Sequence, residues 1–137
     1  CYRARFKEIE YRCSRFWCKY MNHMQNKGIS ELVSDLSTSV RSFHDRFGIP
    51  TISSREQLLT RIPIQDEEVI ELKQAIHDES MERIAEEATD VLYVAIGTLQ
   101  CIDPNLVSQA IKNVIDKNDS KTVETHHINT DGKIVRK

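Results

Sequence analysis

The residues best suited to chemistry are four acids within one helix-favouring stretch. Glu68 and Glu71 are three positions apart, and so are Glu87 and Asp90. On a helix, residues at this spacing share a face, with Cβ atoms roughly 5–6 Å apart. Burying such pairs of carboxylates beside apolar residues without a positive partner is costly. We therefore expect a hard divalent cation, Mg²⁺ with Mn²⁺ as a substitute, between two antiparallel helices.

A simpler interpretation is that these acids are ordinary surface residues. Lys73 and Arg83 are close enough along the chain to neutralise part of the cluster as salt bridges. Two acidic pairs on consecutive helices nevertheless favour a shared cleft, in which the small Ala75 and Ala88 leave room for a metal and its waters. Glu67 stands just outside the first pair, where it could bind a further metal or activate water.

Basic and polar residues near the end of the last predicted helix could form the second half of a phosphate site. They are Lys112, Lys117, Asn118 and Lys121. The helix dipole alone explains Lys117, because a cation is favoured at the C-terminal end of a helix. Metal ligands together with Lys and Asn groups are what binding a polyphosphate requires. There is no glycine-rich Walker loop, which excludes a P-loop enzyme.

Apolar residues at helical spacing predict the elements that position these side chains. The expected helices cover residues 29–47, a short piece from residue 53 broken at Pro63, and residues 64–77, 81–102 and 104–118. Ser30, Ser80 and Asp103 are the expected N-caps, and Gly48 is expected to end the first helix. Short loops between helices predict an all-α fold, an antiparallel four-helix bundle.

Helical geometry also predicts which faces are buried. The buried centre of the helix over residues 64–77 is expected at Val69, Leu72 and Ile76, and that of the next helix near Ala88 and Val91. The four acids border these two stripes. The polar tail over residues 119–137 is expected to contain a turn at residues 130–133, within a short hairpin or an extended arm.

Composition and charge exclude several classes of protein. A chain of 137 residues with a formal net charge of −2 is expected to form one soluble helical domain without a nucleic-acid partner. Its longest apolar run, residues 91–96, is too short to span a membrane. The four cysteines show no zinc-like spacing, so we expect a reducing, cytoplasmic location. The pair His126 and His127 is interpreted as part of a solvated tail.

The first 28 residues are treated as an extension of unclear role. Residues 1–20 are basic and aromatic, which suits an amphipathic helix, a nucleic-acid contact or a targeting segment. Alternatively they are upstream sequence, and the natural start is Met21 or Met24. The helical catalytic domain is expected over residues 29–118, with residues 119–137 completing the nucleotide site.

Four blocks of sequence occur in the order found in a known family. They are residues 43–50 (F-H-D-R-F-G-I-P), residues 67–71 (E-E-V-I-E) with 87–90 (E-A-T-D), residues 90–94 (D-V-L-Y-V), and residues 118–121 (N-D-S-K) with 131–133 (D-G-K). Together they resemble the MazG-like all-α nucleoside triphosphate pyrophosphohydrolases, in their phosphoribosyl-ATP pyrophosphohydrolase-like branch. The resemblance extends from about residue 29 to residue 137.

The resemblance implies a dimeric bundle, or a tetramer, that cleaves a nucleotide between its α- and β-phosphates. The implied Mg²⁺ ligands are Glu68, Glu71, Glu87 and Asp90. Glu67 would be a further ligand or the base that activates water, so that Glu67, Glu68 and Glu71 are the candidate catalytic residues. The implied nucleotide contacts are Asn118 and Lys121, with Lys117 beside them, and His44 and Phe47 would contribute to a nucleobase pocket.

The sequence departs from the family pattern before and after Asn118. Residues 115–117 (I-D-K) replace H-R-S, Asp119 replaces Met, and the spacer from Lys121 to Asp131 is longer. These departures bear on substrate preference more than on the metal site. The function expected is Mg²⁺-dependent hydrolysis of a (deoxy)nucleoside triphosphate, with dUTP or dCTP favoured. The alternatives are phosphoribosyl-ATP hydrolysis in histidine synthesis and a non-catalytic helical dimer that binds nucleotides or a protein partner.

Overall fold

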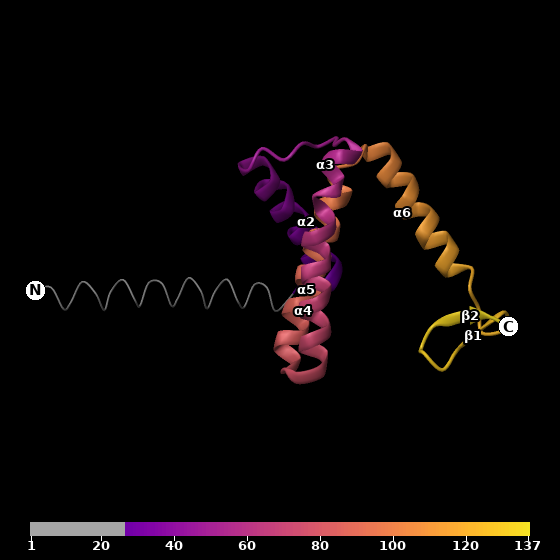
Figure 1. Ribbon diagram of the computed structural model, residues 1–137. Coiled ribbons are helices and arrows are strands. Elements are labelled where there is room, and N and C mark those ends of the chain that lie inside the picture. The colour runs from indigo at the N-terminus through magenta and orange to yellow at the C-terminus, as the bar shows by residue number, and fades with distance from the viewer. Residues whose placement is uncertain (1–26) are drawn as a thin grey trace, which may run out of the picture.

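The computed structural model describes residues 27–137, so the predicted roles of residues 1–20 lie outside the described part of the chain. Its elements, in order, are the helices α2 (Ile29–Arg46), α3 (Arg55–Leu59), α4 (Arg61–Asp78), α5 (Met81–Leu99) and α6 (Pro104–Asp119) and the strands β1 (His126–Ile128) and β2 (Ile134–Arg136) (Figure 1). The predicted helical class is confirmed. The hairpin expected in the tail is also present, since β1 and β2 pair antiparallel.

Most of the predicted helix ends are confirmed by their hydrogen bonds. The hydroxyl of Ser80 accepts from the backbone N–H of Arg83 at 3.3 Å, which caps α5. The carboxylate of Asp103 accepts from the N–H of Asn105 at 2.8 Å, which caps α6. Gly48 follows the end of α2 with a φ of +64°, a conformation that glycine adopts without strain. Local sequence signals therefore determine these boundaries.

Two of the predicted boundaries are wrong. Gly28, and not Ser30, is the N-cap of α2, because the helix already begins at Ile29. Pro63 does not break the chain into two helices. It is the third residue of α4, where the backbone N–H would have no partner within the helix, so proline is tolerated there.

Helices α4 and α5 form an antiparallel pair and lie side by side (Figure 1). Only Glu79 and Ser80 separate the two helices in sequence. The side-chain amide of Gln65 donates to the backbone oxygen of Val91 at 3.2 Å, and Ala75 is fully buried. The candidate acidic residues belong to these two helices, so their packing sets how the acids are placed.

The seam between α4 and α5 is rotated relative to the prediction. Ile76 is 59% exposed and Ala88 is also exposed, whereas Ala75 and Glu87 are buried. The reason is that α4 carries apolar residues on more than one face, including the exposed Ile70, so periodicity gives only an average direction. Glu87 therefore lies inside the seam and not on its border, and Glu68 is half-buried, whereas Glu71 and Asp90 are exposed.

Helix α2 crosses α5 and packs on it through small and buried residues. Val40 and His44 of α2 are buried, and His44 lies against Gly97 of α5. Arg61 of α4 reaches the same point, donating from its guanidinium to the backbone oxygen of Val94 at 2.9 Å. The three helices thus meet at Gly97, where the absence of a side chain allows the close approach.

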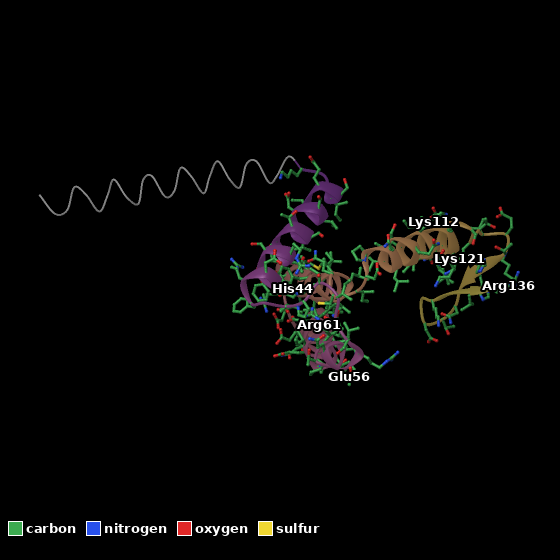
Figure 2. All side chains as sticks on the ribbon, turned by 90° about the horizontal axis from the view of Figure 1, so that it is seen from above. His44, Glu56, Arg61, Lys112, Lys121 and Arg136 are labelled. Carbon is green, nitrogen blue, oxygen red and sulfur yellow. The ribbon has the colours of Figure 1, made fainter. Side chains whose placement is uncertain are left out.

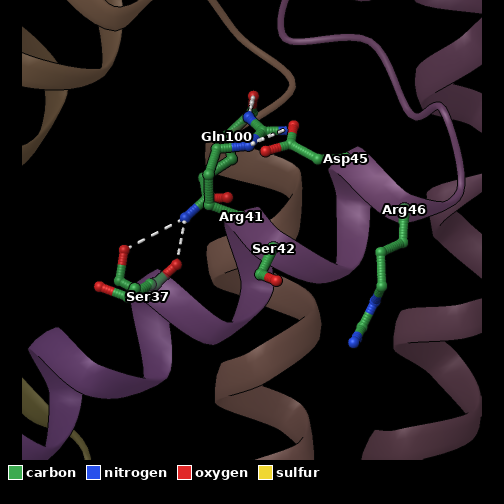
Figure 3. A pocket seen from close by; sticks show the side chains of 7 residues that line it. Ser37, Arg41, Ser42, Asp45, Arg46 and Gln100 are labelled. Atoms are coloured by element: carbon green, nitrogen blue, oxygen red, sulfur yellow. Dashed lines mark hydrogen bonds and ion pairs between the residues drawn. The ribbon is translucent and has the colours of Figure 1, made fainter.

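Polar contacts hold α2 against the end of α5. The side-chain amide of Gln100 donates to the backbone oxygen of Ser37 at 2.9 Å and to its hydroxyl oxygen at 3.1 Å (Figure 3). On the same turn of α2, Arg41 and Asp45 form an ion pair at 3.2 Å. These residues line a shallow pocket, and their mutual contacts indicate a structural role there.

Helix α6 points away from the α4–α5 pair and carries the β1–β2 hairpin at its far end (Figure 1). Its apolar residues are exposed; they include Leu106, Ile111, Val114 and Ile115. This apolar face is therefore uncovered within one chain. No helix in the described range is long and apolar enough to cross a membrane.

We predict that Gly97→Ala destabilises the protein by about 1–3 kcal/mol, through overpacking. A Cβ there would lie 2.5 Å from Arg61 Nη2 and 2.9 Å from His44 Nε2. Arg61 can move aside, but the buried ring of His44 cannot do so easily. The gain of about 0.5–1 kcal/mol in helix propensity from alanine is smaller than this cost. Urea unfolding measures the difference.

The matched control is Gly28→Ser, because no atom lies near a Cβ at Gly28 and serine is a favourable N-cap. Its stability is expected to equal or exceed that of the wild type. A stabilised Gly97→Ala protein would contradict the packing described at this crossing.

Candidate metal centre

The α4–α5 pair brings three of the predicted acids together. Glu68, Glu71 and Glu87 each offer one carboxylate oxygen, and these three oxygens all lie within 4.8 Å of one another. Glu68 and Glu71 are one turn apart on α4, and Glu87 faces them from α5. Spacing along the sequence and antiparallel packing together produce this cluster.

Glu87 provides independent evidence that a cation fits this cluster. The residue is only 3% exposed, and one of its oxygens accepts from the guanidinium of Arg83. Its other oxygen, Oε2, is buried without a hydrogen-bond partner. A buried carboxylate oxygen without a partner is costly, and a divalent cation between the three acids would satisfy it.

Desolvation, and then repulsion among the acids, raises the pKa of two members of the cluster. The pKa of Glu68 is raised by burial, by the charge of Asp90 and then by Glu71. The pKa of Glu71 is also raised, by burial and by the charges of Glu87 and Glu67. Asp90 and Glu67 are therefore close enough to act on the cluster, although both are exposed. An unneutralised excess of negative charge is the electrostatic signature expected of a cation site.

The positive charge at the cluster comes from Arg83. Its guanidinium bonds Glu79 at 3.1 Å, Glu86 at 2.6 Å and also Glu87. Among the described residues, the ion pairs to these acids come from Arg83 and not from Lys73, the other basic residue considered from sequence. The i, i+4 spacing of Arg83 and Glu87 signals this pair, but burial of Glu87 cannot be read from spacing alone.

The predicted phosphate-binding residues lie elsewhere in the same chain. Lys121 donates to the side chain of Asn118 at 2.9 Å, so these two are neighbours at the end of α6, with Lys117 exposed one residue earlier. Figure 2 shows Lys121 on the arm of α6 and the hairpin, away from His44 and Arg61 in the helical core. Within one chain, the structure does not bring these residues to the acidic cluster.

His44 lies in the core and not on an open surface. It is 2% exposed, and its Nδ1 lies 3.9 Å from the Sγ of Cys101, a buried free cysteine. Burial and then the nearby charges of Arg61 and Arg41 lower the pKa of His44, so its neutral form is favoured. In this arrangement His44 packs α2 against α5.

An aromatic cluster lies between α2 and α5, and sequence reasoning identified only one of its members as a candidate for binding. The ring of Phe43 is 4.7 Å from that of Phe47 and meets Tyr93 edge-on at 6.2 Å. Tyr93 follows Asp90 by three positions on α5, so it lies one turn further along the same face. Phe47 is largely exposed, which leaves an aromatic surface open to a flat ligand.

We predict that His44 makes the protein less stable as the pH falls below about 6.5. With a pKa lowered in the folded state, His44 stays neutral while the unfolded chain takes up a proton, so stability is lost over this range. His44→Gln should lose less stability between pH 7 and pH 5.5 than the wild type. Chemical unfolding at each pH measures the two slopes.

The control for this measurement is His77→Gln, because His77 is exposed at the end of α4. This variant should keep the slope of the wild type. Equal slopes for the wild type and His44→Gln would show that His44 does not contribute to the pH dependence.

One comparison with known proteins found a match that covers the region of this cluster. The family model described as phosphoribosyl-ATP pyrophosphohydrolase matches residues 40–117, which is more than half of the chain. The match includes α4, α5 and all four predicted metal ligands, but it ends just before Asn118. Searches of curated proteins and of solved structures gave no match.

The MazG-like resemblance is thereby confirmed, and the non-catalytic alternative is not retained. The chain belongs to the phosphoribosyl-ATP pyrophosphohydrolase family and is a pyrophosphohydrolase, a hydrolase that acts on phosphoric anhydrides.

Proposed function

We propose that this enzyme hydrolyses a (deoxy)nucleoside triphosphate to the monophosphate and pyrophosphate in a Mg²⁺-dependent reaction, with dUTP or dCTP as the preferred substrate. The observation that carries the proposal is the cluster of Glu68, Glu71 and Glu87, in which a buried oxygen of Glu87 has no partner. The cytoplasmic location remains a prediction from cysteine usage.

The acids are proposed to have two roles: some bind the metal, and one accepts a proton from the attacking water. Glu68, Glu71 and Glu87 would hold the cation, and Asp90, whose charge acts on Glu68, would complete the set. A bound Mg²⁺ supplies charge neutralisation of the phosphate oxygens and polarisation of the attacking water. Glu67 is exposed beside the cluster and is the candidate to accept the proton of that water.

The aromatic cluster supports a nucleotide as the substrate. Phe43, Phe47 and Tyr93 form an aromatic cluster one turn along α5 from Asp90 and offer a surface on which a base can stack, worth about 1–3 kcal/mol for each stacked base. Stacking tolerates any base, so this surface supports a nucleotide without selecting dUTP or dCTP. Of the two residues first expected to bind the base, Phe47 is accessible and His44 is buried.

A second candidate substrate is phosphoribosyl-ATP, because the family model that matches the chain is described by that activity. Both substrates require cleavage of the same kind of anhydride bond beside a cation, so the acidic cluster suits either. They differ in the base, a pyrimidine or a purine, and in the phosphoribosyl group that the purine carries, and stacking on the aromatic cluster does not distinguish them.

We further propose that the enzyme is a homodimer in which α6 of one copy approaches the acidic cluster of the other. Exposed apolar residues on several helices support a second copy; examples are Ile70 on α4, Leu92 on α5 and Ile115 on α6. Burial of such residues is favourable by about 25 cal/mol per Å² of apolar surface. This arrangement would close a four-helix bundle and would bring Asn118 and Lys121 to the metal site, where the described part of one chain places Arg83 paired with acids.

We predict that Glu71→Gln lowers kcat/KM on the order of 100-fold or more, because it removes a charged ligand from the cation. The substrates to test with Mg²⁺ and with Mn²⁺ are the common dNTPs and NTPs and phosphoribosyl-ATP, with pyrophosphate release as the measurement. Mg²⁺ should also raise the unfolding temperature of the wild type more than that of Glu71→Gln.

Asp78→Asn is the matched control, since Asp78 is an exposed acid at the end of the same helix and outside the cluster. It should retain wild-type activity. Hydrolysis of phosphoribosyl-ATP alone would select the second candidate substrate, and no pyrophosphate release from any of these nucleotides would exclude both.

We predict a particle of about twice the chain mass of 15.9 kDa in light scattering after gel filtration. Ile115→Glu should shift it toward the monomer, while Asn113→Glu, which adds the same charge on α6 without removing an apolar side chain, should shift it less. Mixing inactive Glu71→Gln with Lys121→Ala should restore part of the activity, because mixed dimers contain one intact site. A monomeric wild type would contradict the dimer proposal.

A further inference from the structure

We propose that Arg83 is an internal counter-ion: it stabilises the metal-free cluster by pairing with Glu87 and competes with the divalent cation for that carboxylate. This inference rests on the proposed metal site. It adds that metal affinity is set partly by a residue that is not a ligand.

The geometry around Arg83 gives it a fixed position. Its backbone N–H is bound by the Ser80 cap at 3.3 Å in the first turn of α5. Its Nε and Nη1 bond Glu79 and Glu86, at 3.1 Å and 2.6 Å, and its Nη2 bonds Oε1 of Glu87. Side chains on a helix lean toward its N-terminus, so Glu87 naturally reaches back to Arg83 one turn earlier.

The three partners of Arg83 differ in burial, and this difference gives Glu87 its special role. The side chains of Glu79 and Glu86 are 34% and 62% exposed, whereas that of Glu87 is 3% exposed. Water can solvate the first two without Arg83. Glu87 would be left as a buried charge beside Glu68 and Glu71, which is strongly destabilising. In the metal-free protein, Arg83 therefore supplies the compensating charge.

A cation bound to the cluster would reduce the stabilisation that the Arg83–Glu87 ion pair provides. It neutralises the same carboxylate, so the attraction between Arg83 and Glu87 contributes less once the metal is bound, and Arg83 also repels the cation. Coupling between two sites is reciprocal, so Arg83 must weaken metal binding by the factor by which metal weakens its own pairing. In the metal-bound state, Glu79 and Glu86 can still hold the guanidinium of Arg83 at the surface.

Direct binding of Mn²⁺, followed by the paramagnetic resonance signal of the free ion, tests this without an activity assay. Arg83→Gln should bind Mn²⁺ about fivefold more tightly than the wild type, or more. Without metal it should unfold at a lower temperature, and Mn²⁺ should raise that temperature by more than in the wild type. Arg83→Lys, which keeps the charge but forms fewer bonds, should bind Mn²⁺ with intermediate affinity.

Lys73→Gln is the matched control, because it removes the same charge from the facing helix and breaks none of the ion pairs described at the cluster. It should change Mn²⁺ affinity less than Arg83→Gln does. An equal change would show that net charge, and not the contact with Glu87, is responsible, and would overturn the proposal.

Weaker or unchanged Mn²⁺ binding by Arg83→Gln would also overturn it, because Arg83 would then be orienting a metal ligand or have no part in binding. If Arg83→Gln folds only with Mn²⁺, the proposal is supported. If it does not fold at all, Arg83→Lys decides, since equal or weaker binding than in the wild type contradicts competition. A wild type that binds no Mn²⁺ would instead refute the metal site itself.

Discussion

The structure depends on the contact between α4 and α5, which brings Glu87 into a buried seam opposite Glu68 and Glu71. Like charges do not gather in a seam unless a cation compensates them. In this chain Arg83 compensates one carboxylate and leaves a buried oxygen of Glu87 without a partner. The chain belongs to a family of pyrophosphohydrolases, and the proposed cation is what would allow a highly charged anion to approach these acids.

Local signals made most of the fold predictable. Helix positions follow from apolar periodicity and from caps such as Ser80 and Asp103, which act over a few residues and need no tertiary context. The failures have physical causes. Pro63 was predicted to break a helix but lies in a first turn that has no hydrogen bond to lose. The seam of α4 was misplaced because apolar residues lie on more than one side of this helix, and both Ile70 and Ile76 are exposed.

The candidate site was predictable in its acids and less so in its surroundings. Glu68, Glu71 and Glu87 come together as their spacing indicates, but the depth of Glu87 depends on how α5 is rotated against α4. His44 was expected near a base and is instead buried, because α2 turns that side chain toward Gly97. The pattern within one stretch of sequence does not specify which side of its helix a neighbouring helix will cover.

The two ends of helix α5 make different kinds of contact. Its first turns carry Arg83 and Glu87 in a charged seam, while its last turns carry Gly97 in a tight crossing with His44 and Arg61. Roughly 15 Å of helix separates Glu87 from Gly97, at about 1.5 Å per residue. Substitutions near Gly97 can therefore tune stability at this crossing without touching the acids proposed to hold the metal.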